Sequence, residues 1–435
     1  MKAFRARPFL GGAVSGYTPW SHSTARAPSC PLRAISSLAQ RRGSGVNYVR
    51  SSIRPGSFVG RPYSIDHKAP KLPPFAFAFD IDGVLLHVAK PIPGATETLE
   101  FLQKHNIPFI LLTNGGGKHE TERVADLSAR LGVELSTDNF IQSHTPFQEL
   151  AHGREGGLRD KNILVTGSDA AKCRVIAEQY GFRHVITPAD ILAAHPTVWP
   201  FDPLMEELYA KTARPLPSPN PKIDAIFVFN DPRDWALDIQ IILDLLMSKD
   251  GILGTYSPRN GLKDLPNGGW QRDGQPPLFF SNPDLFWAAG YPHPRLGQGA
   301  FQAAIAGIWR EVTAGAAELE RVTIGKPHGR TYEFAERVLN AHRAAVLGLD
   351  PEMEGQGQGV LERVYMVGDN PASDIRGANE YESPEGTEWK SVLVRTGVWN
   401  PERGGDPVFK PRAIVDDVKG AVEWALGQEG WKERI

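Results

Sequence analysis

The sequence predicts an α/β fold with parallel sheets, and two observations support this prediction. From residue 75 onward, short apolar runs alternate with amphipathic stretches of helical period, as strands alternate with helices in a parallel sheet. Several of the apolar runs also end directly in Asp, Thr or Lys. Because ligands bind beyond the carboxyl ends of the strands in such sheets, we expect a functional site along one sheet edge.

Composition narrows the class of protein. The chain has 435 residues, 41% of them hydrophobic and 23% charged, which suits about two or three domains with sizeable cores. Residues 1–65 hold ten basic and no acidic residues, so the remainder has 38 basic against 50 acidic residues and is not expected to bind nucleic acid. The two cysteines, Cys30 and Cys173, argue against a disulfide framework. No apolar run reaches the roughly 20 residues that span a bilayer, so no integral membrane segment is expected.

The first 65 residues are rich in Arg, Ser and Ala, which is typical of a mitochondrial transit peptide. Arg61 stands three residues before Ser64, as it would at a processing site. The alternative is a basic arm that binds nucleic acid or anionic lipid. We expect a disordered transit peptide over 1–65 and import into the mitochondrial matrix.

Residues 73–143 predict the first part of a core domain. Strands are expected at 75–79 and 109–112 and from 140, with two helices between them, of which the second ends at Gly132. A second α/β pattern, expected to form a separate domain, covers residues 144–295. Its expected strands are 163–166, 184–187, 223–229 and 278–281, and its expected helices are 170–180 and 234–247.

The core pattern resumes near residue 296 and continues to 428. A helix is expected from 299 to 312, and the strand 322–324 ends in Gly325-Lys326-Pro327. A helix over 331–347 and strands at 364–367, 392–395 and 413–415 follow, then a final helix over 418–426. Residues 351–359 and 380–390 are interpreted as insertions.

Polar side chains follow four of the expected core strands. Asp80 and Asp82 end the first strand. Two carboxylates about 4 Å apart repel by roughly 4 kcal/mol at an effective dielectric of 20, so such a pair suggests a bound cation or a shared proton. The alternative is that Asp82 caps a helix or turn and Asp80 is solvated. Thr113 ends the second strand. Lys326, and then Asp369 with Asp374, end two later strands. A parallel sheet would gather these groups at one edge, where carboxylates suit Mg²⁺ and the lysine and hydroxyl suit a phosphoryl group.

In this order, the set resembles the four motifs of the haloacid dehalogenase (HAD) superfamily. The long interval between the second and third motifs is similar to that of subfamily IIA, the NagD-like proteins with a C2-type cap. The stretches TNGGG from Thr113, NDPRDW from Asn230, SNPD from Ser281 and GDNPASDI from Gly368 resemble the cat-eye-syndrome critical-region group of mitochondrial HAD hydrolases. The resemblance covers residues 73–428 and implies a Rossmann-like core with an inserted α/β cap.

The resemblance also implies roles for the core residues. Asp80 would be the nucleophile that forms an aspartyl-phosphate, and Asp82 the general acid and base, its pKa raised by neighbouring carboxylates. Phosphoryl oxygens would be held by Thr113, by the backbone N–H groups of Asn114 and Gly115, and by Lys326. The Mg²⁺ ligands would be Asp80, Asp369 and the backbone carbonyl of Asp82, with Asp374 supporting Lys326 or the metal.

Cap residues carry weaker indications. Asn230, Asp231 and Arg233 could contact substrate or, with Asp234, cap the helix that follows. Asn282 and Asp284 could line the site or form a turn.

The leading hypothesis is a Mg²⁺-dependent phosphatase of a small phosphate monoester, with a homodimer through the cap as a further expectation. The alternatives are a non-catalytic HAD-fold binding or scaffold protein and a narrow phosphatase in glycerophospholipid metabolism.

Overall fold

The computed structural model describes residues 73–153, 157–287, 291, 293–348, 360–399 and 405–435, all of which belong to the unit Lys68–Ile435. The expected transit peptide and the expected insertion 351–359 lie outside the described residues. Two parallel sheets organise the described part of the chain, here called the core sheet and the cap sheet. This is the α/β architecture that the sequence predicts.

The core sheet is six-stranded and entirely parallel, in the order β15-β14-β13-β1-β4-β5. Its strands are β1 (Phe75–Phe79), β4 (Phe109–Leu112), β5 (Phe140–Ile141), β13 (Arg363–Gly368), β14 (Glu388–Val394) and β15 (Ala413–Val415). All five residues of β1 are buried, because the strand lies inside the sheet between β13 and β4 and helices cover both faces.

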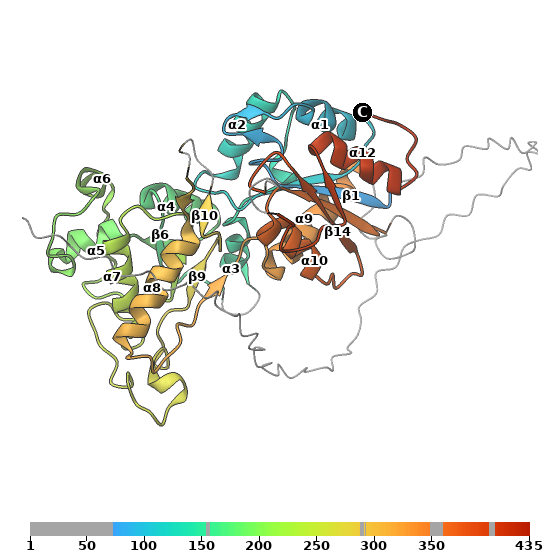
Figure 1. The fold of residues 1–435 in the computed structure, drawn as a ribbon. Coiled ribbons are helices and arrows are strands. Elements are labelled where there is room, and N and C mark those ends of the chain that lie inside the picture. Colours follow the sequence, from blue (N-terminus) through green and yellow to red (C-terminus); the bar gives the residue numbers. More distant parts are fainter. Residues whose placement is uncertain (1–72, 154–156, 288–290, 292, 349–359, 400–404) are drawn as a thin grey trace, which may run out of the picture. The chain divides into compact units, whose positions relative to one another are not determined.

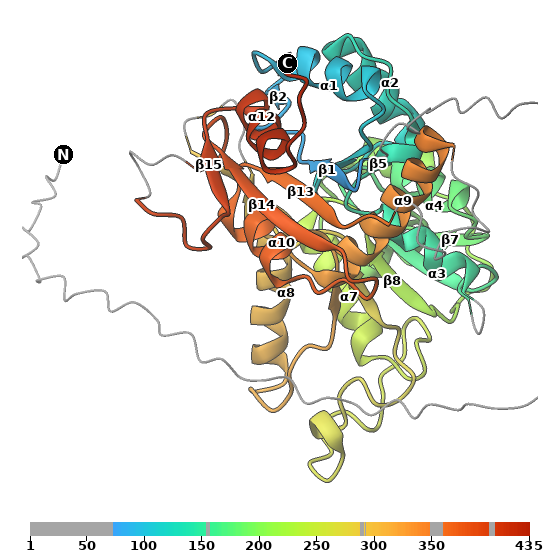
Figure 2. The same ribbon diagram turned by 90° about the vertical axis from the view of Figure 1, so that its right-hand side faces the viewer.

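The side chains of β1 alternate between two different helix layers. Its phenylalanines pack into a hydrophobic cluster with α1 (Ala95–Lys104), α2 (Glu120–Leu131) and α12 (Val418–Gln428). Its alanines face α9 (Gly329–Leu347) and α10 (Arg376–Glu380). Figures 1 and 2 show these helices on either side of the core sheet.

The cap sheet has five parallel strands in the order β12-β9-β8-β6-β7. They are β6 (Asn162–Thr166), β7 (His184–Ile186), β8 (Ala225–Val228), β9 (Leu278–Phe280) and β12 (Val322–Thr323). One face packs on α3 (Gln148–His152) and α4 (Ala170–Gln179). The other packs on α5 (Pro188–Ala194), α6 (Glu206–Thr212), α7 (Trp235–Met247) and α8 (Gln298–Val312).

The expected return to the core near residue 296 differs from the structure. Helix α8 buries Phe301, Ile305 and Trp309 in the hydrophobic cluster of the cap, and β12 pairs with β9 of the cap sheet. The chain therefore rejoins the core only at Lys326. A short apolar run such as 322–324 does not reveal which sheet it joins, because its partner strand is distant in sequence.

Two short antiparallel hairpins complete the strands, β2 (Leu86–His87) with β3 (Lys90–Pro91) and β10 (Phe286–Trp287) with β11 (Arg295–Leu296). The expected insertion 380–390 is packed against the core, because Tyr381 and Ser383 donate hydrogen bonds to Glu336 of α9. In the described part of the chain, no helix combines the length and apolar character needed to cross a membrane.

Candidate active site

Three carboxylates meet at the carboxyl end of the core sheet. Asp80 follows β1, and Asp369 and Asp374 follow β13, which pairs with β1 in parallel through Phe79 and Val367. The three side chains each offer an oxygen within 4.8 Å of the others, and all three residues are buried. The adjacency of the two strands therefore turns separate sequence motifs into a single cluster, as the sequence predicts.

A buried ammonium group completes this cluster. Lys326 Nζ donates hydrogen bonds to Asp80 Oδ1 and to the backbone oxygen of Leu112, both at 2.7 Å, and it forms an ion pair with Asp374 Oδ1 at 2.8 Å. Three oxygen atoms thus lie within 2.8 Å of the ammonium nitrogen. Lys326 was expected to end a core strand; it instead follows the cap strand β12 and reaches the cluster from the segment in which the chain returns to the core.

The charges of the cluster are not balanced by protein groups alone. Burial raises the pKa of Asp80 against the opposing charge of Lys326, and burial with the charges of Asp80 and Asp374 raises the pKa of Asp369 well above its usual value. Burial also raises the pKa of Asp374 to about 6. Burial alone would lower the pKa of Lys326, but Asp374 and Asp80 raise it. Three ionised carboxylates against one ammonium would carry an excess of negative charge, which the raised pKa values oppose and which a hard divalent cation with oxygen ligands, such as Mg²⁺, would offset.

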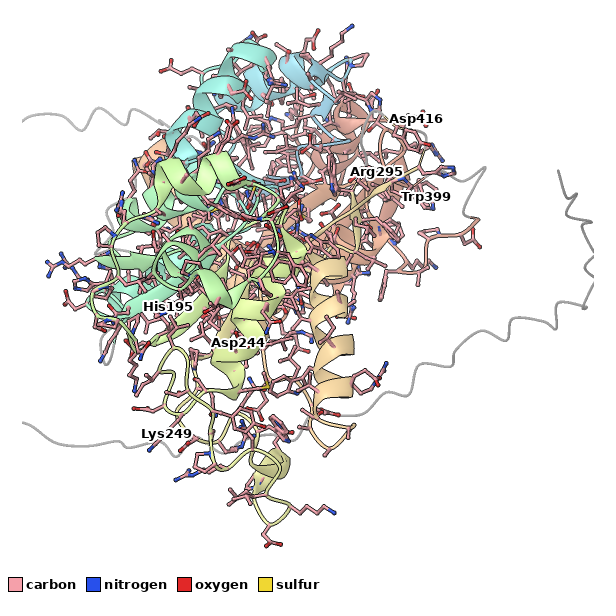
Figure 3. All side chains as sticks on the ribbon, turned by 90° about the vertical axis from the view of Figure 1, so that its left-hand side faces the viewer. His195, Asp244, Lys249, Arg295, Trp399 and Asp416 are labelled. Carbon is pink, nitrogen blue, oxygen red and sulfur yellow. The ribbon has the colours of Figure 1, made fainter. Side chains whose placement is uncertain are left out.

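Asp369 is bound by a backbone N–H group and is closely surrounded by two glycines. Val398 donates its backbone N–H to Asp369 Oδ2 at 2.6 Å. A Cβ at Gly397 would lie 1.8 Å from that oxygen and one at Gly83 would lie 2.4 Å from it, so neither position accepts a side chain. Trp399, labelled in Figure 3, donates its backbone N–H to the backbone oxygen of Asp369. Residues 397–399 are not among the predicted site residues; their only local signal in the sequence is their place after an apolar strand.

Asp82 differs in its surroundings from the three clustered carboxylates. Its side chain is 60% exposed, and Arg123 Nη2 of α2 lies 3.9 Å from Asp82 Oδ2. Surrounding protein groups partly desolvate the carboxylate although its side chain is exposed; this desolvation raises the pKa of Asp82, and the charge of Arg123 opposes the rise. The raised pKa of Asp82 agrees with its expected role as general acid. The expected cause of the rise was crowding by other carboxylates, and the structure instead gives desolvation as its cause. Arg123 was not predicted as a site residue.

The loop Thr113–Gly117 after β4 lies beside the cluster. Thr113 is buried, and its hydroxyl oxygen accepts the N–H of Gly115 at 3.0 Å. The side chain of Asn114 forms a reciprocal pair with the backbone of Lys326: Oδ1 accepts the Lys326 N–H at 2.7 Å, and Nδ2 donates to the Lys326 carbonyl at 2.9 Å. The side chain of Asn114 therefore fixes the backbone of Lys326, whereas only the backbone N–H of Asn114 was expected to contribute to the site.

Asn282 and Asp284 reach the same loop from the cap. Asn114 Nδ2 also donates to Asp284 Oδ2 at 3.0 Å, and Asn282 Nδ2 donates to the backbone oxygen of Asn114 at 3.0 Å. Burial raises the pKa of Asp284 to about 7, against the hydrogen bond from Asn114 and the charge of Lys326. The structure thus brings both residues to the site; the local turn, in which Asp284 donates its N–H to Asn282 Oδ1, is also present.

The other predicted cap residues differ in how close they lie to the site. Asn230 accepts the Ser168 N–H at 2.7 Å, and its Nδ2 lies 2.4 Å from where a Cβ of Gly117 would be, so it borders the loop. Asp231 is half-buried and Arg233 is exposed. Asp234 caps α7 by accepting the Leu237 N–H. No recorded contact among the described residues joins Asp231 or Arg233 to the carboxylate cluster.

Two segments of the chain match family models of related hydrolases. Residues 77–183 match the family described as haloacid dehalogenase-like hydrolase, and residues 323–421 match a second HAD-hydrolase-like family.

Two curated proteins match over 81% of the chain. A mitochondrial hydrolase of Saccharomyces cerevisiae is 40% identical over 372 residues, which is 95% of its length. A cardiolipin synthase (CMP-forming)/mitochondrial hydrolase fusion protein of Schizosaccharomyces pombe is 41% identical over 354 residues, and the chain spans only 53% of its length.

A solved structure, a hypothetical protein of Pyrococcus horikoshii, is similar to the chain in fold. It is 21% identical, with a TM-score of 0.51, over 81% of this chain and 99% of that one.

Proposed function

The chain belongs to the haloacid dehalogenase-like hydrolases, and we propose that it is a Mg²⁺-dependent phosphatase that hydrolyses a small phosphate monoester through an aspartyl-phosphate at Asp80. The observation that carries the proposal is the contact of Lys326 Nζ with Asp80 Oδ1 inside a buried cluster of three carboxylates. An ammonium group at this position orients the nucleophile and offsets the charge of a transferring phosphoryl group.

The chemistry follows from the residues in place. An oxygen of Asp80 attacks phosphorus, the bond from phosphorus to the ester oxygen breaks, and Asp82 gives its proton to that leaving oxygen. Asp82 then takes a proton from water, which attacks phosphorus and breaks its bond to Asp80. Thr113 and the N–H groups of its loop would bind the other phosphoryl oxygens.

The metal would be held by Asp80, Asp369 and the backbone carbonyl of Asp82, with Asp374 supporting Lys326. When bound, Mg²⁺ supplies positive charge that reduces the repulsion between the phosphoryl group and the carboxylates. The buried oxygen donors fit this ion, since a cluster with excess negative charge is costly without a cation or bound protons.

A protein lacking residues 1–65 should release 4-nitrophenol from 4-nitrophenyl phosphate with Mg²⁺, and EDTA should abolish this release. If Asp80→Asn retains full turnover, the assignment of the nucleophile is wrong. The non-catalytic alternative predicts that no ester in a broad phosphate panel is hydrolysed although Mg²⁺ still stabilises the fold against urea.

A second candidate is a phosphatase of a glycerophospholipid precursor, favoured by the fission-yeast relative in which a similar hydrolase is joined to a cardiolipin synthase. The hairpin after Asp284 also exposes apolar side chains, with Phe286 50% and Trp287 43% exposed, and Arg295 of β11 (Figure 3) stacks on Tyr291. If this candidate holds, a glycerophosphate ester with acyl chains should have a higher kcat/KM than the same ester without them.

The names of the relatives support a mitochondrial location, and import to the matrix is part of the proposal. Fractionated mitochondria with the tagged full chain would test it. The homodimer through the cap stays a prediction, which sedimentation of the purified protein would test.

A further inference from the structure

We propose that His144 is a positioning residue that holds the loop Thr113–Gly117 in its phosphate-binding geometry and connects that loop to the cap through Tyr180. The proposal rests on the proposed function, because the loop matters only if it receives a phosphoryl group. His144 follows β5, in the segment that leads from the core sheet into the cap, and it is fully buried.

The hydrogen bonds of His144 define its tautomer. Its Nε2 accepts the backbone N–H of Gly117 at 3.2 Å, so Nε2 carries no proton. The proton of the neutral ring is therefore on Nδ1, which donates to the hydroxyl oxygen of Tyr180 at 2.8 Å. Burial lowers the pKa of His144 to about 4, against the charge of Glu120 and together with that of His119. At neutral pH the ring is thus an acceptor toward the loop and a donor toward the cap.

The chain of hydrogen bonds ends on a buried carboxylate. The Tyr180 hydroxyl donates to Glu120 Oε1 of α2, and the Thr145 hydroxyl donates to the same oxygen at 2.6 Å. Each donor in the chain has one acceptor, so the direction of every hydrogen bond is fixed. Glu120 belongs to the core, Tyr180 to the cap and His144 to the segment between them, so the chain joins all three.

The glycines of the loop fit this arrangement. Gly117 has φ 100°, a conformation that disfavours other residues and directs its N–H toward the His144 ring. A Cβ at Gly116 would lie 2.9 Å from His144 Cδ2, so the ring packs directly against the loop. The centroid of the His144 ring also lies 5.3 Å from the centroid of the Phe229 ring of the cap. The imidazole is therefore held between the loop and the cap, and it restricts the loop by packing and by a hydrogen bond.

Three variants distinguish a role of His144 in positioning the loop from a role in the stability of the fold. His144→Phe keeps a planar ring but neither hydrogen bond, His144→Gln keeps an acceptor and a donor, and Tyr180→Phe removes the acceptor of the Nδ1 proton. His184→Phe, at an exposed position of β7, is the control for loss of an imidazole. Hydrogen exchange of the peptide containing Thr113–Gly117 reads the loop directly and does not depend on activity.

We expect His144→Phe to increase exchange of the loop peptide and to raise KM and the inhibition constant of inorganic phosphate by about tenfold, the effect of one lost hydrogen bond, with a smaller change in kcat. His144→Gln should recover most of the difference, Tyr180→Phe should give a partial effect, and His184→Phe should give none. The proposal would be overturned if exchange of the loop peptide were unchanged in both Tyr180→Phe and a folded His144→Phe. It would also be overturned if His144→Gln showed the same increase in exchange and in KM as His144→Phe. Failure of the proposed function is distinct, because the unaltered protein would then hydrolyse no phosphate ester while the exchange differences remained.

Discussion

Replacing Lys326 with Met removes the one positive charge that the described structure places among the three clustered carboxylates. The ammonium lies 2.7 Å from Asp80 Oδ1 and 2.8 Å from Asp374 Oδ1, and the lysine is only 1% exposed. Loss of one partner from a buried ion pair costs about 3–5 kcal/mol, since the remaining charge stays desolvated. We expect the free energy of unfolding of Lys326→Met to fall by about this amount at pH 8 in EDTA.

The pH dependence of this loss has a defined sign. The pKa of Asp374 is already raised to about 6 by burial, and without Lys326 it should rise further. A carboxyl whose folded pKa exceeds its unfolded value takes up a proton on folding, so stability falls as pH rises from the unfolded pKa through the folded pKa. The deficit of Lys326→Met should therefore be smaller at pH 5 than at pH 8.

Urea unfolding followed by tryptophan fluorescence at both pH values measures the deficit. Lys249→Met is the matched control, because Lys249, labelled in Figure 3, is exposed. If Lys326→Met matches the unaltered protein at pH 8 in EDTA, the ammonium does not compensate the carboxylates and the reasoning is refuted.

Four further predictions address the same site and its surroundings. Asp80→Asn should lower kcat for 4-nitrophenyl phosphate by at least about 10³-fold, as expected for loss of a nucleophile; near-normal turnover would contradict the role. For a phosphate ester with a poor leaving group, Asp82→Asn should lower kcat by about 10²–10⁴-fold, the range for loss of a general acid. An unchanged kcat for that ester would exclude Asp82 as the general acid. Mg²⁺ at 100 times its dissociation constant should raise the unfolding free energy by about 2.7 kcal/mol over EDTA, and much less in Asp369→Asn. Burial raises the pKa of Asp238 to about 8, so the unaltered protein loses stability as pH rises toward 8; Asp238→Asn should unfold at higher urea than the parent at pH 9, and a lower midpoint there would contradict this.

Local patterns in the sequence predict the strands and the residues at their ends. The apolar run 75–79 is followed by Asp80, and the run 364–367 by Gly368 and Asp369; the adjacency of the two runs follows from the parallel sheet. The core strands β1, β4, β13 and β15, the helix ended by Gly132 and the cap strands 162–166, 225–228 and 278–280 lie close to where periodicity and turn residues predict them. Strand β14 differs, because it begins at Glu388, inside the expected insertion 380–390.

Contacts between distant segments could not be predicted in the same way. The pairing of β12 with β9 depends on packing of α8, which no local pattern records, and so the return of the chain to the core was placed about 30 residues too early. The pair formed by Asn114 with the Lys326 backbone, and the support of Asp369 by Val398, join segments that are far apart in sequence. His144 showed no signal as a single histidine, because its role depends on the tautomer that Gly117 and Tyr180 impose.

The central claim is that Asp80 carries the phosphoryl group during turnover. Protein lacking residues 1–65 would be mixed with 4-nitrophenyl phosphate and Mg²⁺, quenched in acid within the first turnovers, and its peptides analysed by mass spectrometry. We predict one added phosphoryl group on the peptide containing Asp80, which is absent in Asp80→Asn. Steady hydrolysis with no phosphoryl group on that peptide, and with turnover retained in Asp80→Asn, would contradict the claim.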